Sequence, residues 1–325
     1  MAFISVIVPI YNSEDFLSRC LDSLLNQSYK DFNIICVDDC GTDRSKQIAQ
    51  QYAHSYPNII TLVSNPKNLG AGMTKMRGLQ IATSPYVMFV DSDDYVSEDY
   101  LATYASAVIS NNVDVVVGGY TKDIDGRLIY NRPPSGRWSL LTYTISCAKL
   151  FRRNFLMENS VSYSDSKLDD ILFSASVYCS QPSYSVIEYG GYHYVLNRSS
   201  TTSKAGRESN FEELVISVFT EILQRNPDLS SNPNDYRAIE YFCLANIYNS
   251  LIVHSHGCGL KAMKNKVSYT FKNVQRLFPD YLHNPFISLK CSKGQIAKIR
   301  YTIWLLMHLR QIHLDIPIFY LLSLI

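Results

Sequence analysis

The segment Tyr86–Asp94 constrains the fold more than any other part of the chain, because an apolar run ends in three clustered carboxylates. Val87–Val90 is predicted to be a buried strand, and Asp91, Asp93 and Asp94 lie where it ends. Carboxylates this close repel one another unless a cation or a hydrogen-bonding ligand shares them, which indicates a hard divalent metal. A strand followed by an Asp-rich helix N-terminus is the alternative.

Two earlier segments share this design. Phe3–Ile10 is an apolar, β-branched run that ends at Tyr11, and Asn33–Asp39 is a second apolar run that ends in paired carboxylates. Both runs are predicted to be buried strands. A helix is predicted after each strand, the first opened by Ser13 as its N-cap and the second starting at Cys40–Asp43.

This order of strands and helices predicts a parallel sheet with right-handed crossovers. In such sheets ligands bind beyond the carboxyl ends of the strands. Tyr11, Asp39 and Asp91 are therefore expected along one edge of the sheet, although they lie far apart in the sequence.

Several segments in fixed order now resemble the family 2 glycosyltransferases, an inverting family with the nucleotide-sugar-binding GT-A fold. They are Val6–Asn12, Cys20–Tyr29, Phe32–Asp39, Asn68–Gly70, Ala82–Tyr86, Phe89–Asp94 and Lys149–Arg153. The resemblance spans about residues 3–202. It implies an α/β fold, a Rossmann-like, mainly parallel sheet flanked by helices, with a helical C-terminal extension.

The resemblance also implies a site for a UDP-sugar. Tyr11 can stack on a planar base, and Asp39 can accept a hydrogen bond from the imino N–H that uracil offers. The nucleotide-binding residues expected from the family are Pro9, Tyr11, Asn12, Asp39, Lys75, Asp91 and Arg198.

The family places the metal on Asp93, with Asp91 contacting the ribose or helping through water, and the expected ion is Mn²⁺ or Mg²⁺. For Asp38, a ligand role and a structural role in the following turn both remain open. Asp94 can hold either the loop or the sugar.

The catalytic base is expected before an apolar helix beyond the metal motif, and the chain offers Lys167–Phe173 there. Asp170 matches the base position of the family, and Asp169 stands where Glu is usual. The alternative is that both carboxylates only favour the positive N-terminus of the helix.

Two positions depart from the family pattern. Lys75 stands where Arg is usual, with Arg77 nearby, and either cation can reach a phosphate or the donor sugar or can lie on a solvated helix face. Tyr192–Thr201 resembles the segment that closes over the diphosphate, yet Val195 occupies its usual Arg position. Arg198 is the expected substitute, followed by His193, which can instead be packed.

The implied function is metal-dependent, inverting transfer of a sugar from a UDP-sugar to a hydroxyl of a saccharide or lipid-linked saccharide. The family uses such reactions in the synthesis of bacterial cell-surface polysaccharide, lipopolysaccharide or capsule. A catalytically inactive nucleotide-binding or regulatory module is the alternative. A nucleotidyltransferase does not fit, because no glycine- and basic-rich loop follows the first strand.

The composition also indicates in which cellular compartment the protein works. The chain has 325 residues and a net charge of +1, which disfavours nucleic acid as a partner. Its eight cysteines form no Cys-x-x-Cys pair, so they are interpreted as reduced thiols of a cytoplasmic protein.

The motifs predict a catalytic domain over residues 1–203, with a nucleotide-binding half at 1–95 and an acceptor-side half at 96–203. Residues 204–325 are predicted to be a helical region, beginning with helices at Phe211–Gln224 and Tyr236–His254.

The end of the chain is basic. Ten Lys or Arg residues follow Gly257, against only Asp280 and Asp315. Ile296–Ile325 is too interrupted by charge to span a membrane, but its aromatic and basic residues suit peripheral contact with the anionic inner face of the plasma membrane. A helix packed on the catalytic domain or in a homodimer is the alternative.

Overall fold

The computed structural model describes residues 2–164, 168–196, 211–255, 257–289, 297–322 and 324. They form two compact units. The first unit contains residues 1–133, 143–165 and 176–197, and the second contains residues 134–142, 166–175 and 198–325.

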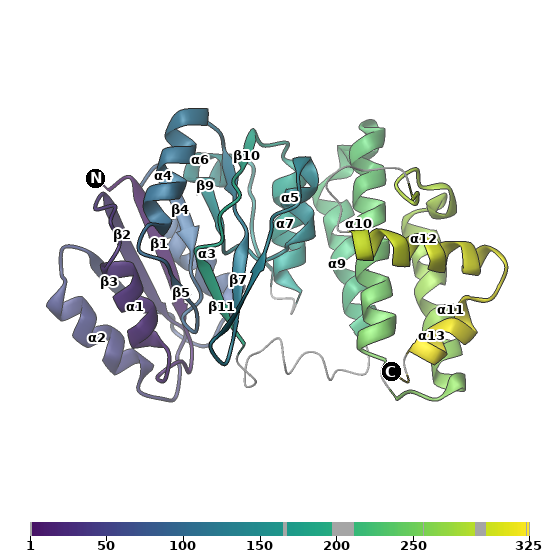
Figure 1. The fold of residues 1–325 in the computed structure, drawn as a ribbon, viewed down its shortest axis with the longest axis horizontal. Coiled ribbons are helices and arrows are strands. Elements are labelled where there is room, and N and C mark those ends of the chain that lie inside the picture. Colours follow the sequence, from purple (N-terminus) through teal and green to yellow (C-terminus); the bar gives the residue numbers. More distant parts are fainter. Residues whose placement is uncertain are drawn as a thin grey trace. The chain divides into compact units, whose positions relative to one another are not determined.

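A seven-stranded sheet in the order β10-β6-β9-β4-β1-β2-β3 forms the core of the first unit (Figure 1). Its strands are β1 (Ile4–Ile10), β2 (Phe32–Asp38), β3 (Ile60–Ser64), β4 (Tyr86–Phe89), β6 (Val115–Val117), β9 (Lys149–Arg152) and β10 (Tyr184–Val186). The described pairs are parallel, except that β9 runs antiparallel to β4 and β6. The near-continuous apolar runs of β1 and β2 arise because both faces of a parallel sheet are buried. The prediction of a mainly parallel sheet is confirmed.

Helices and a second, smaller sheet complete this unit. The helices are α1 (Leu17–Leu25), α2 (Ser45–Ser55), α3 (Ala71–Ile81), α4 (Tyr100–Asn111), α6 (Arg153–Glu158) and α7 (Asp169–Cys179), the last having residues in both units. The smaller sheet has the order β5-β11-β7-β8, with β5 (Tyr95–Val96), β11 (Tyr192–Val195), β7 (Tyr120–Ile124) and β8 (Arg127–Asn131).

The predicted starts of α1 and α2 are wrong. The carbonyl of Ser13 accepts hydrogen bonds from the backbone of Phe16 and Leu17, so a turn precedes α1, which begins only at Leu17. The backbone N–H of Ser13 is bonded to Ser45 Oγ at 2.8 Å. Asp43 accepts from the backbone N–H of Ser45 at 2.9 Å, and α2 begins there. The contact between Ser13 and Ser45, which lie 32 positions apart, therefore helps to set these boundaries.

The second unit is helical. Its elements are η1 (Gly136–Trp138), α5 (Ser139–Thr142), α9 (Phe211–Arg225), η2 (Pro227–Ser231), α10 (Pro233–Val253), α11 (Leu260–Leu277), η3 (Tyr281–His283), α12 (Ala297–Gln311) and α13 (Asp315–Leu322). The predicted helices α9 and α10 are confirmed, and Asn232 caps α10 ahead of Pro233.

The C-terminal helices are packed within this unit. Tyr248 of α10 donates a hydrogen bond to the Met307 sulfur of α12 at 2.6 Å, and its ring stacks on Phe319 of α13 at a centroid distance of 5.4 Å. All three side chains are buried. Within the described ranges, none of the helices combines the length and apolarity that crossing a bilayer requires.

Close packing of α3 on β1 depends on Gly78. A Cβ atom at this position would lie 2.3 Å from Ile7 Cγ2, far inside van der Waals contact. We expect Gly78→Ala to lower the free energy of unfolding by about 1–3 kcal/mol, because α3 must shift or the core must strain.

Urea denaturation followed by circular dichroism measures this loss. Gly259→Ala is the matched control, because nothing lies within 4 Å of a Cβ atom there. Its effect should stay within about 0.5 kcal/mol. Equal stability of the two variants would contradict the tight packing of α3.

Candidate active site

Strand register brings the predicted residues to one edge of the large sheet. Ile10 pairs with Asp38 across β1 and β2, and Ile7 pairs with Phe89 across β1 and β4. Tyr11 and Asp39 follow directly after β1 and β2, and Asp91 lies two residues after the end of β4. In the structure the three positions lie beyond the carboxyl ends of β1, β2 and β4, as expected.

Tyr11 is presented to solvent, with 49% of its surface exposed. The next residue, Asn12, has a φ of 47°, and its Oδ1 accepts a hydrogen bond from the backbone N–H of Thr42 at 2.7 Å. This contact fixes the turn that carries the Tyr11 ring. Pro9 is buried inside β1 opposite Val37, so its contribution in this structure is to the strand.

Asp39 organises the neighbouring turn. Its Oδ1 accepts hydrogen bonds from the backbone N–H of Leu69 at 2.7 Å and from Asn65 Nδ2 at 2.8 Å, and its Oδ2 accepts from the backbone N–H of Gly70 at 2.9 Å. A carboxylate offers about four acceptor positions, so these three bonds leave one unused, although the side chain is only 2% exposed. Contact between Asp39 and uracil stays a prediction.

Asp38 has a structural partner. Its buried carboxylate pairs with Lys46 Nζ of α2 at 3.2 Å. The ion pair links the end of β2 to the helix that follows it, in agreement with the structural alternative for this residue.

Asp91 is held by groups that are distant in sequence. Its Oδ1 pairs with Lys75 Nζ at 2.9 Å, its Oδ2 accepts a weak hydrogen bond from the Cys147 thiol at 3.3 Å, and its backbone N–H donates to the Tyr192 hydroxyl at 3.3 Å. Lys75 is only 4% exposed. Its ammonium also lies 3.4 Å from Ser146 Oγ.

The structure therefore places Lys75 beneath Asp91 rather than on a solvated helix face. Sequence reasoning missed Cys147 and Tyr192 as members of this site. Cys147 lies just before the Lys149–Arg153 motif, and Tyr192 opens the segment that resembles the closing loop, so proximity to these motifs was the available signal.

Asp94 is buried and bonded to β11. Its carboxylate accepts hydrogen bonds from the Tyr192 hydroxyl and from the backbone N–H of Val195, the latter at 2.8 Å. Burial raises the pKa of the Asp94 carboxyl well above its usual value, and the negative charges of Asp91 and Asp93 raise it further. Of the two roles considered for Asp94, these contacts favour holding the loop.

A metal at this edge would take few ligands from the protein. Within the described residues, no group of three or more His, Cys, Asp and Glu side chains is arranged to enclose a metal ion. Mg²⁺ and similar ions are commonly held by one or two carboxylates together with substrate phosphates and water. Asp93, partly exposed between Asp91 and Asp94, fits such an arrangement as the principal protein ligand.

His193 is packed in a stack. Its ring lies parallel to Tyr95 at a centroid distance of 4.4 Å, and the Arg19 guanidinium lies 4.6 Å from the same tyrosine ring. Its Nε2 is 2.9 Å from Ser97 Oγ. Burial lowers the pKa of His193, so this stack favours a neutral, structural imidazole. Arg198, the other candidate for the phosphates, lies outside the described residues.

Asp169 and Asp170 form the first turn of α7. The backbone N–H of Asp170 donates to Asp169 Oδ1 at 2.8 Å, so Asp169 acts as a local cap, and Asp170 is half-buried. Both residues belong to the second unit. The role of Asp170 as the base stays a prediction.

Comparison with known proteins places the chain in a family. Residues 5–167 match the family described as Glycosyl transferase family 2. The chain is 32% identical over 210 residues to the poly(ribitol-phosphate) beta-glucosyltransferase of Bacillus spizizenii, a match that covers 60% of this chain and 32% of that protein. It is 29% identical over 250 residues to Staphylococcus aureus TarS, a poly(ribitol-phosphate) beta-N-acetylglucosaminyltransferase, covering 73% of this chain and 43% of TarS. The matches thus span less than half the length of these relatives.

Solved structures agree on the fold. The crystal structure of S. aureus TarS 1–349 in complex with UDP-GlcNAc has a TM-score of 0.75 at 24% identity, covering 99% of this chain and 90% of that one. The mannosyltransferase PcManGT of Pyrobaculum calidifontis, in complex with GDP-Man and Mn²⁺, has a TM-score of 0.53 at 16% identity, covering 87% and 88% of the two chains. The predicted family is confirmed: this chain belongs to glycosyl transferase family 2, with the GT-A fold and a helical C-terminal region.

Proposed function

We propose that this chain is a metal-dependent inverting enzyme that moves a sugar from a UDP-sugar to a hydroxyl group of a cell-surface polymer. The observation that carries the proposal is the convergence of Tyr11, Asp39, Asp91 and Asp93 beyond the ends of three adjacent strands. An exposed ring, a carboxylate with a remaining acceptor position and a carboxylate loop are the groups that a base, a ribose and a metal-bound diphosphate require.

The reaction would be one displacement. Asp170 takes the proton of the acceptor hydroxyl as general base, and the hydroxyl oxygen bonds to the anomeric carbon as the bond to the UDP oxygen breaks. Attack opposite the leaving group inverts the anomeric carbon, so an α-linked donor gives a β-glycoside. No covalent enzyme intermediate is needed.

The remaining residues bind and position the donor. Asp93 would hold Mn²⁺ or Mg²⁺, with Asp91 on the ribose or contributing through water; such an ion supplies positive charge to a leaving diphosphate. PcManGT, which shares the fold, was solved with Mn²⁺. The buried Lys75 ammonium pairs with the Asp91 carboxylate and holds it in place.

The acceptor belongs to the proposal as well. Two relatives are named for a poly(ribitol-phosphate) acceptor, and TarS was solved with UDP-GlcNAc. We therefore propose a UDP-hexose or UDP-N-acetylhexosamine as donor and a hydroxyl of an anionic surface polymer as acceptor, with the enzyme in the cytoplasm at the inner face of the plasma membrane.

A panel of UDP-sugars, scored by UDP release with and without poly(ribitol phosphate), tests this function. One donor should give release that rises with the polymer and yields a β-linked product. UDP binding without release or transfer from any donor, on any surface polymer offered, would instead identify an inactive nucleotide-binding module.

Contact with an anionic membrane is a further part of the proposal. Apolar side chains remain exposed in and just after α12, among them Leu305 at 49% and Ile312 at 63%, and the first turn of this helix carries the basic residues Lys298 and Arg300. Such a surface suits binding at the level of the lipid headgroups.

We expect the double substitution Leu305→Glu and Ile312→Glu to lower binding to anionic vesicles about tenfold or more, because it replaces apolar contact with like-charge repulsion. Flotation with phosphatidylglycerol vesicles measures binding. The control replaces Ile109 and Leu128, which are 66% and 55% exposed, with Glu. Failure of the native chain to float at low salt would exclude membrane contact. Deleting the helices is a poorer test because Met307 and Phe319 are buried.

A further inference from the structure

Helix α11 carries an unusual concentration of positive charge. Its 18 residues include Lys261, Lys264, Lys266, Lys272 and Arg276 and no Asp or Glu. Lys266 is accounted for by a partly buried ion pair at 2.9 Å to Glu212 of α9. The other four cations are exposed.

These four cations form one stripe, the α11 stripe, defined by Lys261, Lys264, Lys272 and Arg276. At about 100° per residue they fall within an arc of roughly 120°, and at 1.5 Å per residue they span about 22 Å. The polar residues between them, Asn265, Ser268 and Gln275, are also exposed. The opposite face buries Met263, Val267, Thr270, Phe271 and Val274.

Helix energetics account only for Arg276, which lies in the last turn, where a cation is favoured by the helix dipole. Lys261 lies in the first turn, where a cation opposes the helix dipole. Lys272 and Arg276 are like charges four residues apart, a spacing that destabilises a helix. An anion with repeated charges bound along the stripe would relieve this repulsion.

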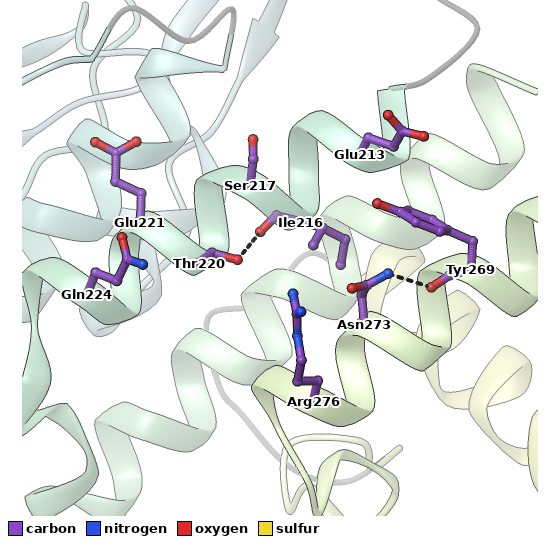
Figure 2. A pocket seen from close by; sticks show the side chains of 9 residues that line it. All are labelled: Glu213, Ile216, Ser217, Thr220, Glu221, Gln224, Tyr269, Asn273 and Arg276. Atoms are coloured by element: carbon purple, nitrogen blue, oxygen red, sulfur yellow. Dashed lines mark hydrogen bonds between the residues drawn. The ribbon is translucent and has the colours of Figure 1, made fainter.

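A polar hollow adjoins the stripe between α9 and α11, with a volume of about 510 Å³. Residues that line it are Glu213, Ile216, Ser217, Thr220, Glu221, Gln224, Tyr269, Asn273 and Arg276. Arg276 belongs to both features, and Figure 2 shows its side chain extending from α11 towards α9.

The hollow has a different chemistry from the stripe. Glu213 and Glu221 repel phosphate but accept hydrogen bonds from hydroxyl groups, and Asn273 and Gln224 can donate or accept. Tyr269, 44% exposed, offers an aromatic face to C–H groups. A ligand that fits both features therefore carries negative charges at intervals and hydroxyl groups between them.

We infer that α11 and the adjoining hollow bind a hydroxyl-rich phosphodiester polymer, with its phosphates on the α11 stripe and a polyol or sugar unit in the hollow. The inference rests on the proposed function, because such a polymer presents the acceptor hydroxyl. A second site away from the reacting hydroxyl would keep a long acceptor bound between transfers. An anionic bilayer would match the stripe but leave the hollow without a ligand.

Binding of poly(ribitol phosphate) to the full chain, measured by titration calorimetry at low and high salt, is the first test. The triple variant Lys261→Gln, Lys264→Gln and Lys272→Gln should bind roughly 10- to 100-fold more weakly at low salt. A plot of log K against the logarithm of the salt concentration should have a slope that is less negative by about 2 in this variant. This value takes about 0.7 for each of the three lost phosphate contacts on a flexible strand. UDP affinity should not change.

A charge-matched control replaces the exposed residues Lys30, Arg127 and Arg132 of the first unit with Gln. It should bind the polymer within about twofold of the native chain, since only nonspecific charge is lost. Equal losses in the two triple variants, or none in either, would overturn the inference.

Other ligands and a hollow variant test the second half of the inference. The native chain should prefer poly(ribitol phosphate) to inorganic polyphosphate and to neutral dextran, and the stripe variant should keep most of the native binding to phosphatidylglycerol vesicles. Tyr269→Ala should weaken binding of the polyol polymer several-fold and leave polyphosphate unaffected, whereas Tyr56→Ala, at a similarly exposed tyrosine, should change neither. Equal affinity for polyphosphate, or a loss of vesicle binding in the stripe variant as large as its loss of polymer binding, would show attraction by charge alone and overturn the inference.

Failure of this inference is distinguishable from failure of the proposed function. Sugar transfer that is native-like in the stripe variant, together with unaltered polymer affinity, would overturn only the α11 site. Polymer binding through α11 without transfer from any UDP-sugar would instead overturn the proposed function.

Discussion

Replacing Asp170 with Asn should reduce turnover by about 10²–10⁴-fold while leaving the affinity for UDP nearly native. A general base acts on the acceptor hydroxyl and makes no contact with the nucleotide, so the two measurements should separate. Asn preserves the size of the side chain and its place in the first turn of α7. The measurements are UDP release with the best donor and titration calorimetry with UDP.

Asp169→Asn is the matched control for this substitution. The Asp169 carboxylate accepts a hydrogen bond from the backbone N–H of Asp170, and the side-chain oxygen of an Asn can accept the same bond. We expect a loss in turnover well below that of Asp170→Asn. The reverse order of the two losses would assign the base to Asp169.

Replacing Asp93 with Ala should weaken UDP binding in the presence of Mn²⁺ by about 10²-fold or more, because a metal clamp on a diphosphate contributes several kcal/mol. Chelation of the metal should weaken binding by the native chain to a similar extent and have little effect on the variant. Asp15→Ala, at an exposed carboxylate, is the control. Native affinity that withstands chelation would contradict a metal on Asp93.

Asp93 is a cleaner probe of the metal than Asp91. Removing the Asp91 carboxylate would break its ion pair with the buried Lys75 ammonium, and removing one partner of a buried ion pair is strongly destabilising. Loss of binding by an Asp91 variant would then mix a change in stability with a change in the site.

The arrangement of β1, β2 and β4 could be predicted because it follows from patterns in the local sequence. β1, β2 and β4 are apolar runs that end in polar residues, and parallel strands bring those ends together. The starts of α1 and α2 could not be predicted in this way, because Ser13 bonds to Ser45, a residue of the other helix.

The partners of the carboxylates were beyond local sequence for the same reason. Cys147 meets Asp91 across 56 positions, and Tyr192 meets Asp94 across 98. Lys75 could be recognised as a cation near the site, but only packing revealed that its charge is directed at Asp91. Polar contacts of this kind follow from the fold and leave no periodic pattern.

The bond between Tyr192 and Asp94 limits how the protein can be divided. A fragment of residues 1–95 would contain Asp39, Asp91, Asp93 and Asp94. It would lack the Tyr192 hydroxyl and the Val195 N–H that donate hydrogen bonds to Asp94. Even the segment that matches the family, residues 5–167, ends before Tyr192. In a truncated chain the Asp94 side chain would be exposed to water, and the loop that carries Asp93 would lose the hydrogen bonds that tie it to β11. Domain exchange between relatives should therefore transfer β4 and β11 together.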